Sequence, residues 1–541
     1  MGPSGGGRIA AKRCRRAKPP SGAGAGEDRL SALPDDILVL ILLRLDPTDG
    51  SYAAGRTSVL SRRWRRVWAL LPDLSFPLLS EPGHIATALA AHGAAALRDL
   101  SVVTADANAE SVASLLAAAA ARRISGRLDI FNISLKRGDA AAAAGEEDPN
   151  NPAGEAVGPV DRGAFGLPCL GDATAVSLRL GYLGLAFPPA AVFARLTELS
   201  LISVRFGSRC DLGGALSSPR CPSLEKLTIR NAIGLVDLAI HSESLLQLVL
   251  CRFDGLEQLT IVAPALEDLN TTNCFPFGRP VADISTPKLV KLQWKDPYDP
   301  STVQFSNMGS LQSLSLDFFH VYGQHDSEDN RNLLKFLQRF QLIDSLAVSL
   351  FYRQVISNLQ YLMDDITRLP HISILTLLLA SKEHSFGASA FHILKLCTGI
   401  RKLRLMLLGS STDLKELSAC PSGCICDQPT DWKSEELLLN SLEVVVLFDL
   451  KGADNEVAFV KRLLNWATKL KMMTITFDCS VSGNKAAEVC RALSSLARPE
   501  TCKKFYRYRS ADNKSCYLFA NQLAKAGDSL STGYLHFIER V

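Results

Sequence analysis

A short leucine pattern, L-x-x-L-x-L, recurs through the middle of the chain and constrains its fold more than any other feature. From Leu224 onward, successive copies begin 21, 21, 23 and 22 residues apart. A period of roughly 20–29 residues leaves room for one strand and a short return segment. Each such unit can bury its leucines only against its neighbours, so the sequence predicts an elongated solenoid. The regular copies begin at Leu196, Leu224, Leu245, Leu266, Leu289 and Leu311.

This spacing is typical of leucine-rich repeats, and a finer pattern indicates what lies opposite the strands. Half-period copies at Leu235 and Leu256 leave no room for a helix, so we expect strands on both faces there. Where the spacing lengthens, the outer segments become helical patterns, at Asn330–Phe340 and Asn455–Leu470. Weaker copies of the leucine pattern begin at Ile343, Ile372, Ile400, Leu442 and Leu470.

Residues 28–76 contain more apolar positions than one small core can use. Pro34 suits the first turn of a helix, and Asp35 and Asp36 favour its positive end. From Ile37 to Leu45 nearly every position is apolar, whereas a helix with one buried face shows three or four apolar positions in two turns. We therefore expect this helix to lie between its own domain and a partner.

A second helical pattern closes this stretch. Ser61 is a suitable N-cap, and Pro72 ends a helix that should run to about Leu71. Trp64 and Trp68 share one face of this helix with further apolar residues, and arginines occupy the other. The tryptophans suit a domain core, but tryptophan also dominates many interfaces, so Trp64 could serve either purpose.

The segments LSALPDDILVLILLRL and RTSVLSRRWRRVWALLPDLSF resemble an F-box, in the plant form that begins D-R-[LI]-S-x-L-P-D. Members of that family use a three-helix module to bind a Skp-type adaptor of a cullin–RING ubiquitin ligase. The connector after Leu45 is longer and richer in glycine than usual. The resemblance implies an adaptor-binding set at Leu33, Pro34, Ile37, Leu38, Ile41, Leu42, Leu45, Val59, Leu60 and Trp64, with Trp68 as a contact or core residue.

Residues 428–480 resemble the FBD module that often ends plant F-box/leucine-rich-repeat proteins, through a pattern that includes Trp432, Leu442, Val445, Leu450 and Gly452. Physically this segment reads as a strand, a turn, an amphipathic helix and a strand, which would cap the repeat array. The expected fold class is therefore α/β, a small three-helix F-box followed by a leucine-rich-repeat solenoid with strands on its concave face. The expected divisions are a disordered basic tail (1–27), the F-box (28–76), a helical and stranded linker (77–137), a disordered acidic loop (138–163), the solenoid (164–427), the FBD-like cap (428–500) and a C-terminal segment (501–541).

The sequence contains neither a recognisable catalytic motif nor a RING-like cysteine array, so we expect no enzyme and no cofactor. Cys420, Cys424 and Cys426 form C-x-x-x-C-x-C, but a structural metal site needs four ligands and no fourth lies close in sequence. A loop with incidental thiols is the favoured interpretation, and no metal is predicted. No apolar run reaches the roughly 18 residues that span a bilayer, so no membrane association is expected.

Charge separates the tail from the body. The net charge is +4, but residues 1–26 hold six basic side chains and no acidic one, which leaves the remainder at about −2. The body is therefore not expected to bind nucleic acid. The basic run Lys12–Lys18 suits a nuclear-import signal or a solvated tail, and we expect a nuclear or cytoplasmic protein.

These patterns favour a substrate-recognition subunit of a Skp–cullin–F-box ubiquitin ligase, whose F-box docks on the adaptor while the repeats hold an unidentified target protein. The alternative is a non-catalytic leucine-rich-repeat protein that binds a partner or senses a ligand without assembling a ligase. A third class, a nucleic-acid-binding regulator, rests on the basic tail alone.

Overall fold

The computed structural model describes residues 32–44, 57, 61–77, 79, 81–93, 97–134, 162–189, 191–207, 211–275, 280–306, 308–324, 328–408, 420, 423–427, 431–509 and 517–518. These residues belong to two compact units, which are taken separately below. The first comprises residues up to Leu71 together with 92–94, and the second comprises the rest. The predicted acidic loop and basic tail lie almost entirely outside the described residues.

The first unit contains the two helices that the sequence predicts, each slightly shorter than expected. Helix α1 spans Asp35–Leu42 and follows Pro34, and helix α3 spans Arg62–Trp68. The hydroxyl of Ser61 accepts a hydrogen bond from the Trp64 amide at 3.4 Å, which confirms the predicted N-cap. Helix α3 ends three residues before the predicted Leu71, in a turn that leads to Pro72.

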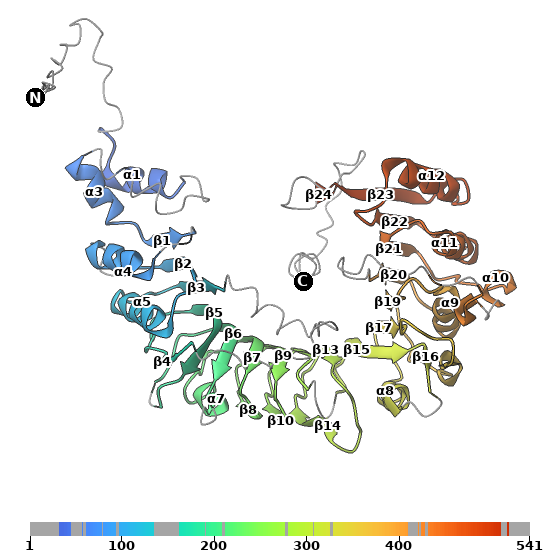
Figure 1. Cartoon of the computed structure of the whole chain (residues 1–541), viewed down its shortest axis with the longest axis horizontal. Coiled ribbons are helices and arrows are strands. Elements are labelled where there is room, and N and C mark those ends of the chain that lie inside the picture. Colours follow the sequence, from blue (N-terminus) through green and yellow to red (C-terminus); the bar gives the residue numbers. More distant parts are fainter. Residues whose placement is uncertain are drawn as a thin grey trace, which may run out of the picture. The chain divides into compact units, whose positions relative to one another are not determined.

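The second unit is built on one long, mostly parallel sheet, which confirms the predicted solenoid (Figure 1). Within this sheet the strands lie side by side in the order of the chain, except that β4 pairs only with β5, and β24 runs antiparallel to β23. The strands are β1 (Asp73–Phe76), β2 (Asp99–Ala105), β3 (Arg127–Ile133), β4 (Ala164–Gly166), β5 (Ala175–Ala186), β6 (Glu198–Phe206), β7 (Lys226–Ile233), β9 (Gln247–Asp254), β11 (Asp268–Thr272), β13 (Lys291–Lys295), β15 (Ser313–His320), β17 (Ser345–Phe351), β19 (Ile374–Ala380), β20 (Lys402–Leu407), β21 (Val444–Leu450), β22 (Met472–Phe477), β23 (Cys502–Arg509) and β24 (Tyr517–Leu518).

The outer segments change type with repeat length, as predicted. Where the period is short, they form a second parallel sheet of β8 (Asp237–His241), β10 (Gln258–Val262), β12 (Val281–Ser285) and β14 (Val303–Phe305). Elsewhere they are mostly helical, and Figure 1 shows helices α5, α9, α11 and α12 outside the strands of this unit. The helices are α4 (Pro82–Ala91), α5 (Ala109–Ala121), α7 (Leu212–Ala215), α8 (Glu328–Leu337), α9 (Gly387–Leu396), α10 (Asp431–Ser434), α11 (Asp454–Trp466) and α12 (Gly483–Ser494), with 3-10 turns η2 (Met363–Asp365) and η3 (Ile425–Asp427), and β16 (Tyr322–Gly323) pairs with β18 (Gln360–Tyr361).

One ladder of aligned apolar side chains forms the spine of the core. Each member is the second leucine of its repeat, or its equivalent, and sits directly opposite the same position in the next strand. All of them are buried, so every repeat covers its neighbour's leucine. The ladder includes Leu74, Leu100, Leu128, Val176, Leu199, Leu227, Leu248, Leu269, Leu292, Leu314, Leu346, Leu375, Leu403, Val445 and Met473.

The sheet begins earlier in the chain than the repeats recognised in the sequence. Strand β1 lies in the stretch assigned to the F-box, and β2 and β3 lie in the predicted linker, yet all three pair in parallel with the repeat strands. Strand β3 pairs directly with β5, so the sheet continues past the predicted acidic loop, as expected. The solenoid therefore starts at Asp73.

A column of left-handed backbone crosses five adjacent repeats. Tyr182, Ser203, Asn231, Arg252 and Asn273 have φ values of 63°, 53°, 53°, 56° and 52°. Where strands β5, β6, β7 and β9 pair, the register skips these positions. A left-handed residue with a side chain costs roughly 1–2 kcal/mol, so the column is strained backbone that the repeat packing imposes.

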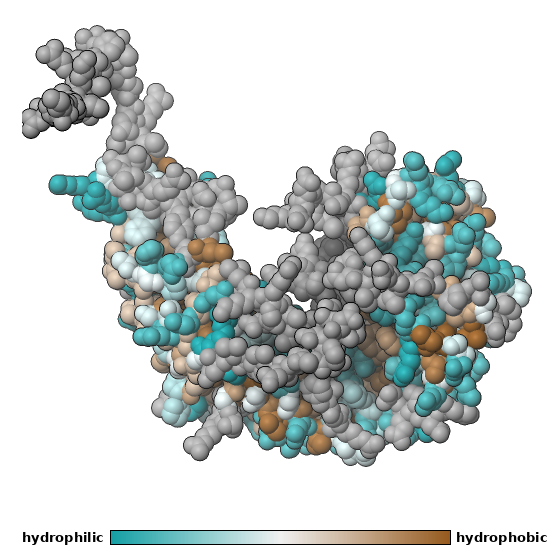
Figure 2. Space-filling model, in the orientation of Figure 1, coloured by the Kyte–Doolittle hydropathy of each residue, from teal (hydrophilic) through white to brown (hydrophobic). Residues whose placement is uncertain are grey.

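Outer-strand side chains leave some apolar surface. Val236, Val262 and Val281, beside or within the second sheet, are 50%, 40% and 47% exposed. Figure 2 shows hydrophobic colour over the part of the surface where Figure 1 places β10 and β14, among hydrophilic neighbours. Single apolar residues of this kind are normal on a protein surface. Among the described residues, no helix is long and apolar enough to cross a membrane.

Candidate functional site

The loop that precedes helix α1 is held by an arginine from helix α3. The Nε of Arg63 donates a hydrogen bond to Oδ1 of Asp35 at 2.8 Å, and its terminal nitrogen forms an ion pair with the same carboxylate at 2.7 Å. Arg63 also donates to the carbonyl of Leu33. Because the guanidinium bonds Leu33 and Asp35, the residues on either side of Pro34, it restricts the conformation of the loop and holds Leu33 and Pro34 in a defined position.

Helix α1 presents two different faces. Leu38 and Leu42 are 1% and 4% exposed, and Val67 and Leu71 of the same unit are buried as well. By contrast, Ile37 and Leu40 of α1 and Leu43, the residue that follows the helix, lie outside: Ile37 is 40%, Leu40 52% and Leu43 38% exposed. Large apolar side chains at this spacing form a stripe along one helix, which water disfavours and a partner protein can cover.

The structure therefore divides the adaptor-binding residues that the resemblance implies. Leu33, Pro34, Ile37 and Ile41 lie at least partly on the surface, whereas Leu38 and Leu42 face inward. Leu40 and Leu43 are exposed but were not in the predicted set, and their exposure follows from the same helical period that buries Leu38 and Leu42. Leu45, Val59 and Leu60 lie outside the described residues.

The tryptophans of helix α3 are both half-buried. Trp68 packs edge-to-face against His92, with ring centroids 5.4 Å apart at an interplanar angle of 83°. This contact supports the interpretation of Trp68 as a core residue rather than an adaptor contact. Trp64 lies one turn earlier and keeps part of its ring accessible. The part played by Arg63 was not anticipated, although the run of arginines beside these tryptophans was the available signal.

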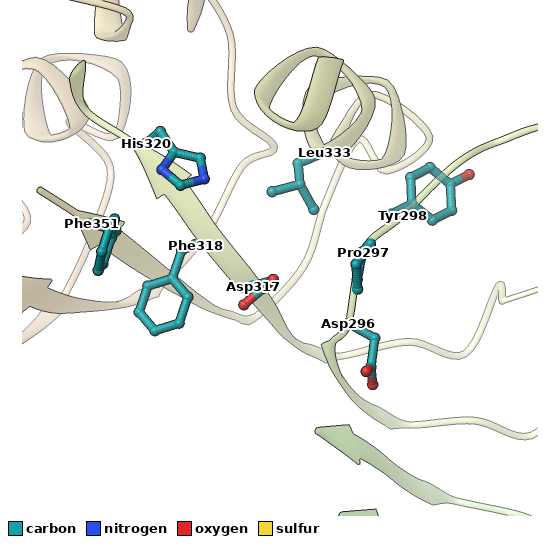
Figure 3. A pocket seen from close by; sticks show the side chains of 8 residues that line it. All are labelled: Asp296, Pro297, Tyr298, Asp317, Phe318, His320, Leu333 and Phe351. Atoms are coloured by element: carbon teal, nitrogen blue, oxygen red, sulfur yellow. The ribbon is translucent and has the colours of Figure 1, made fainter. Parts of the chain in front are cut away.

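The second unit contributes a pocket of about 210 Å³ at the ends of strands β13, β15 and β17 (Figure 3). Phe318 and Phe351 form one wall, with ring centroids 5.7 Å apart, and Leu333 of helix α8 reaches in from above. His320 stands at the end of the same strand as Phe318, and its ring lies 5.6 Å from that of Phe351. The remaining lining residues are Asp296, Pro297, Tyr298 and Asp317.

The carboxylates of this pocket are built into the fold. Asp296 is 1% exposed and accepts backbone hydrogen bonds from Cys274 at 2.5 Å and Phe275 at 3.1 Å. Burial raises the pKa of Asp296 to about 6, although the two amide bonds oppose the shift. Burial also lowers the pKa of Lys295, against the attraction of nearby Asp317. Paired acids and aromatic rings can hold a hydrogen-bond donor or a cation from a ligand or a target side chain.

The pocket is smaller than the roughly 300–1,000 Å³ of sites that enclose a small molecule. It therefore suits one protruding side chain better than a whole ligand. The sequence named no target-binding residue, and nothing in the motif L-x-x-L-x-L distinguishes Asp296 or Asp317 from other residues after a strand.

Family models of known proteins match residues in both units. The F-box domain model matches residues 30–75. A model described as the leucine-rich repeats of the FBD-associated F-box protein At5g56370 matches residues 168–321. The F-box match extends through Asp73 and Leu74, which pair in the solenoid sheet.

Three relatives from Arabidopsis thaliana are similar to the chain over different lengths. The putative F-box protein At1g67390 is 54% identical over 54 residues, about 10% of each chain. The putative F-box/FBD/LRR-repeat protein At4g03220 is 24% identical over 475 residues, 83% of this chain and 89% of that protein. The putative F-box/FBD/LRR-repeat protein At3g49030 is 27% identical over 272 residues, 49% of this chain and 51% of that protein. The identity is thus 54% over the short alignment and 24–27% over the two longer ones.

Proposed function

Because the chain is a plant-type F-box/leucine-rich-repeat protein, we propose that it is the substrate-recognition subunit of a Skp–cullin–F-box ubiquitin ligase. In this proposal residues 28–76 dock on a Skp-type adaptor, and the repeats hold a target protein. The observation that carries the proposal is the exposed apolar stripe of helix α1, beside a loop fixed by Arg63. Proteins of this family are generally non-catalytic adaptors.

In this proposal the protein would promote ubiquitin transfer by bringing the target close to the enzyme that modifies it. A ligase subunit without catalytic groups accelerates ubiquitin transfer by holding target lysines near a conjugating enzyme on another chain, which raises their effective concentration. The solenoid suits this task because its sheet presents strand residues over many repeats, and its pocket offers a place for one target side chain. The target protein itself is not identified by these features.

The docking loop can be tested by co-purification. The full chain is co-expressed with a Skp-type adaptor, as wild type and as the double variant Leu33→Ala with Pro34→Ala. We expect the double variant to lose the adaptor while keeping its circular dichroism and its melting temperature. Leu438→Ala is a matched control, because this side chain is 62% exposed but belongs to the second unit. Undiminished adaptor recovery by the double variant would reject the role of the loop.

The runner-up is a leucine-rich-repeat protein that binds a partner or senses a ligand without assembling a ligase, and the pocket beside Phe318 is the feature that favours it. Cullin recovery distinguishes the two. Cullin that co-purifies with wild type but not with a deletion of 28–76 supports the ligase subunit. Recovery of neither adaptor nor cullin would favour the runner-up. Proteins enriched by the same deletion under proteasome inhibition are candidate targets.

The cellular location is part of the proposal. The basic run Lys12–Lys18 supports entry into the nucleus, and the remainder of the protein would act there or in the cytoplasm. Deleting residues 1–26 from a fluorescent fusion should abolish nuclear accumulation and leave adaptor binding intact. Loss of function together with loss of nucleic-acid binding would instead support the third class considered above.

A further inference from the structure

Three thiols and one imidazole meet near the end of the repeat array. The Nδ1 atom of His384 lies 3.2 Å from Sγ of Cys420 and 3.6 Å from Sγ of Cys424. The sulfur atoms of Cys420 and Cys426 are 3.5 Å apart. One nitrogen or sulfur atom from each of the four residues lies within 4.8 Å of all the others. The fourth group that the sequence lacked nearby is therefore supplied by a histidine from the preceding repeat.

The separations of 3.6 Å and 3.5 Å match two edges of a small tetrahedron around a metal, and the separation of 3.2 Å is slightly shorter than such an edge. With Zn–S at about 2.3 Å and Zn–N at about 2.0–2.1 Å, tetrahedral angles place the ligand atoms roughly 3.5–3.8 Å apart. A disulfide would require a sulfur–sulfur distance of about 2.05 Å, far shorter than the separation between Cys420 and Cys426. The arrangement thus resembles a shared coordination sphere more than a bonded pair.

The surroundings orient the ligands as a metal site requires. The Nε2 atom of His384 lies 3.2 Å from the carbonyl of Gln354, so a proton on Nε2 donates there and leaves the Nδ1 lone pair facing the sulfurs. The Ser385 amide donates to Sγ of Cys426 at 3.4 Å. The Tyr352 ring stacks on His384, with centroids 6.0 Å apart at 22°. His384 and Cys426 are 3% and 2% exposed, whereas Cys420 and Cys424 are half-buried, so the site is shielded from water on one side.

We propose that His384, Cys420, Cys424 and Cys426 form a structural zinc site. Three thiolates and a neutral imidazole are a ligand set that zinc prefers, and four protein ligands leave no open position for catalysis. The site is closed by two separate segments: His384 lies in the turn between β19 and α9, and the cysteines lie beside η3. Zinc would clip these segments together.

The proposed clip lies where the repeats meet the FBD-like segment. The Tyr322 hydroxyl donates to the carbonyl of Ile425 at 3.4 Å, which joins η3 to an earlier repeat. Trp432, the first residue of the FBD pattern, packs so closely on Gly387 that an added Cβ there would lie 2.4 Å from the indole ring. A metal at this junction would fix the long connection between β20 and β21. It would not take part in adaptor docking.

Metal content tests the proposal directly. The full chain is purified, loaded with zinc chloride, dialysed against zinc-free buffer and measured by elemental analysis. We expect one zinc ion per chain in wild type, and loss of it in Cys424→Ser and in His384→Ala. His384→Cys should restore binding, because four thiolates also hold zinc. His392→Ala is the matched control: its Nε2 lies 2.8 Å from the Ile366 carbonyl, as His384 lies near Gln354, but His392 is outside the cluster.

X-ray absorption of the wild-type chain removes the dependence on variants that fail to fold. We expect three sulfur neighbours at about 2.3 Å and one nitrogen at about 2.0–2.1 Å. A shell made only of oxygen and nitrogen atoms would overturn the proposal, because it would mean adventitious zinc. So would a Cys420–Cys426 disulfide in the non-reduced protein, equal zinc content in wild type and Cys424→Ser, or stoichiometric iron in place of zinc.

Discussion

Two substitutions in helix α1, Leu38→Ala and Leu40→Ala, should differ sharply in their effect on the stability of the first unit. Leu38 is 1% exposed and Leu40 is 52% exposed, although they lie two positions apart on the same helix. Truncating a buried leucine costs about 2–5 kcal/mol, whereas an exposed substitution usually changes stability by less than about 0.5 kcal/mol. A unit of this size has only a few kcal/mol to lose. We expect Leu38→Ala to unfold much of the first unit and Leu40→Ala to leave it folded.

Hydrogen–deuterium exchange of the full chain, followed in peptides that cover helices α1 and α3, measures this difference. A loss of about 2–5 kcal/mol speeds exchange from the open state by roughly thirtyfold to a few thousandfold, since about 1.4 kcal/mol is a factor of ten. Leu40→Ala should change exchange by less than about threefold and should still weaken adaptor binding. Equal exchange in the two variants, or faster exchange in Leu40→Ala, would refute the assigned orientation of the helix.

Three further predictions test the second unit. Burial raises the pKa of Asp296 to about 6, so the folded chain binds this proton more tightly than the unfolded chain does. The free energy of unfolding, measured in urea, should therefore fall by up to roughly 3 kcal/mol as the pH rises from about 4 to 6. The decrease should be smaller in Asp296→Asn. Arg252→Gly removes the strain of a φ of 56° and should leave the free energy of unfolding unchanged or raise it by up to about 1 kcal/mol. Arg230→Gly, at an ordinary strand position, should lower it. Asn132→Ala leaves the buried amide and carbonyl of Ala107 unpaired and should cost about 2–4 kcal/mol in the same assay.

The regular repeats could be predicted because their stabilising contacts are periodic in the sequence. Each ladder leucine packs on the equivalent residue one repeat away, so the spacing of Leu227, Leu248 and Leu269 is also the spacing of the strands. The same logic predicted strands on both faces where the period is short, because 21 residues cannot hold a strand, a helix and two turns. Helices α8 and α11 followed where the connections lengthen.

The first repeats were missed because they precede the regularly spaced copies, in the stretch assigned to the F-box and in the linker after it. Leu71, Leu74 and Phe76 match the pattern with phenylalanine at its end, and Leu97, Leu100 and Val102 match it with valine. A strand position buried between two layers accepts any large apolar side chain, so phenylalanine and valine serve as well as leucine. A search for apolar character at these three positions would have placed the start of the sheet at β1.

The orientation of helix α1 was beyond the sequence for a different reason. Its residues are apolar almost all round, so the helical period gives no contrast between inner and outer faces. The tertiary packing of the helix decides which side chains are buried: α1 packs against α3, and Leu38 and Leu42 are its buried leucines. The sequence therefore predicts an interface in this stretch, but it does not indicate which leucines would belong to it.

The thiol–imidazole cluster shows what a ligand search must include when the fold is a solenoid. Metal motifs are normally sought within a few residues, as in C-x-x-C, because many small zinc modules place their ligands on one turn. In stacked repeats, residues one period apart are also neighbours: Ile374 pairs with Lys402, and Lys402 with Val444. His384 lies 36 residues before Cys420, which is within that range of periods. A search that used the repeat length as its window would have tested His384 as the fourth ligand, so the repeat has to be recognised before the cysteines can be interpreted.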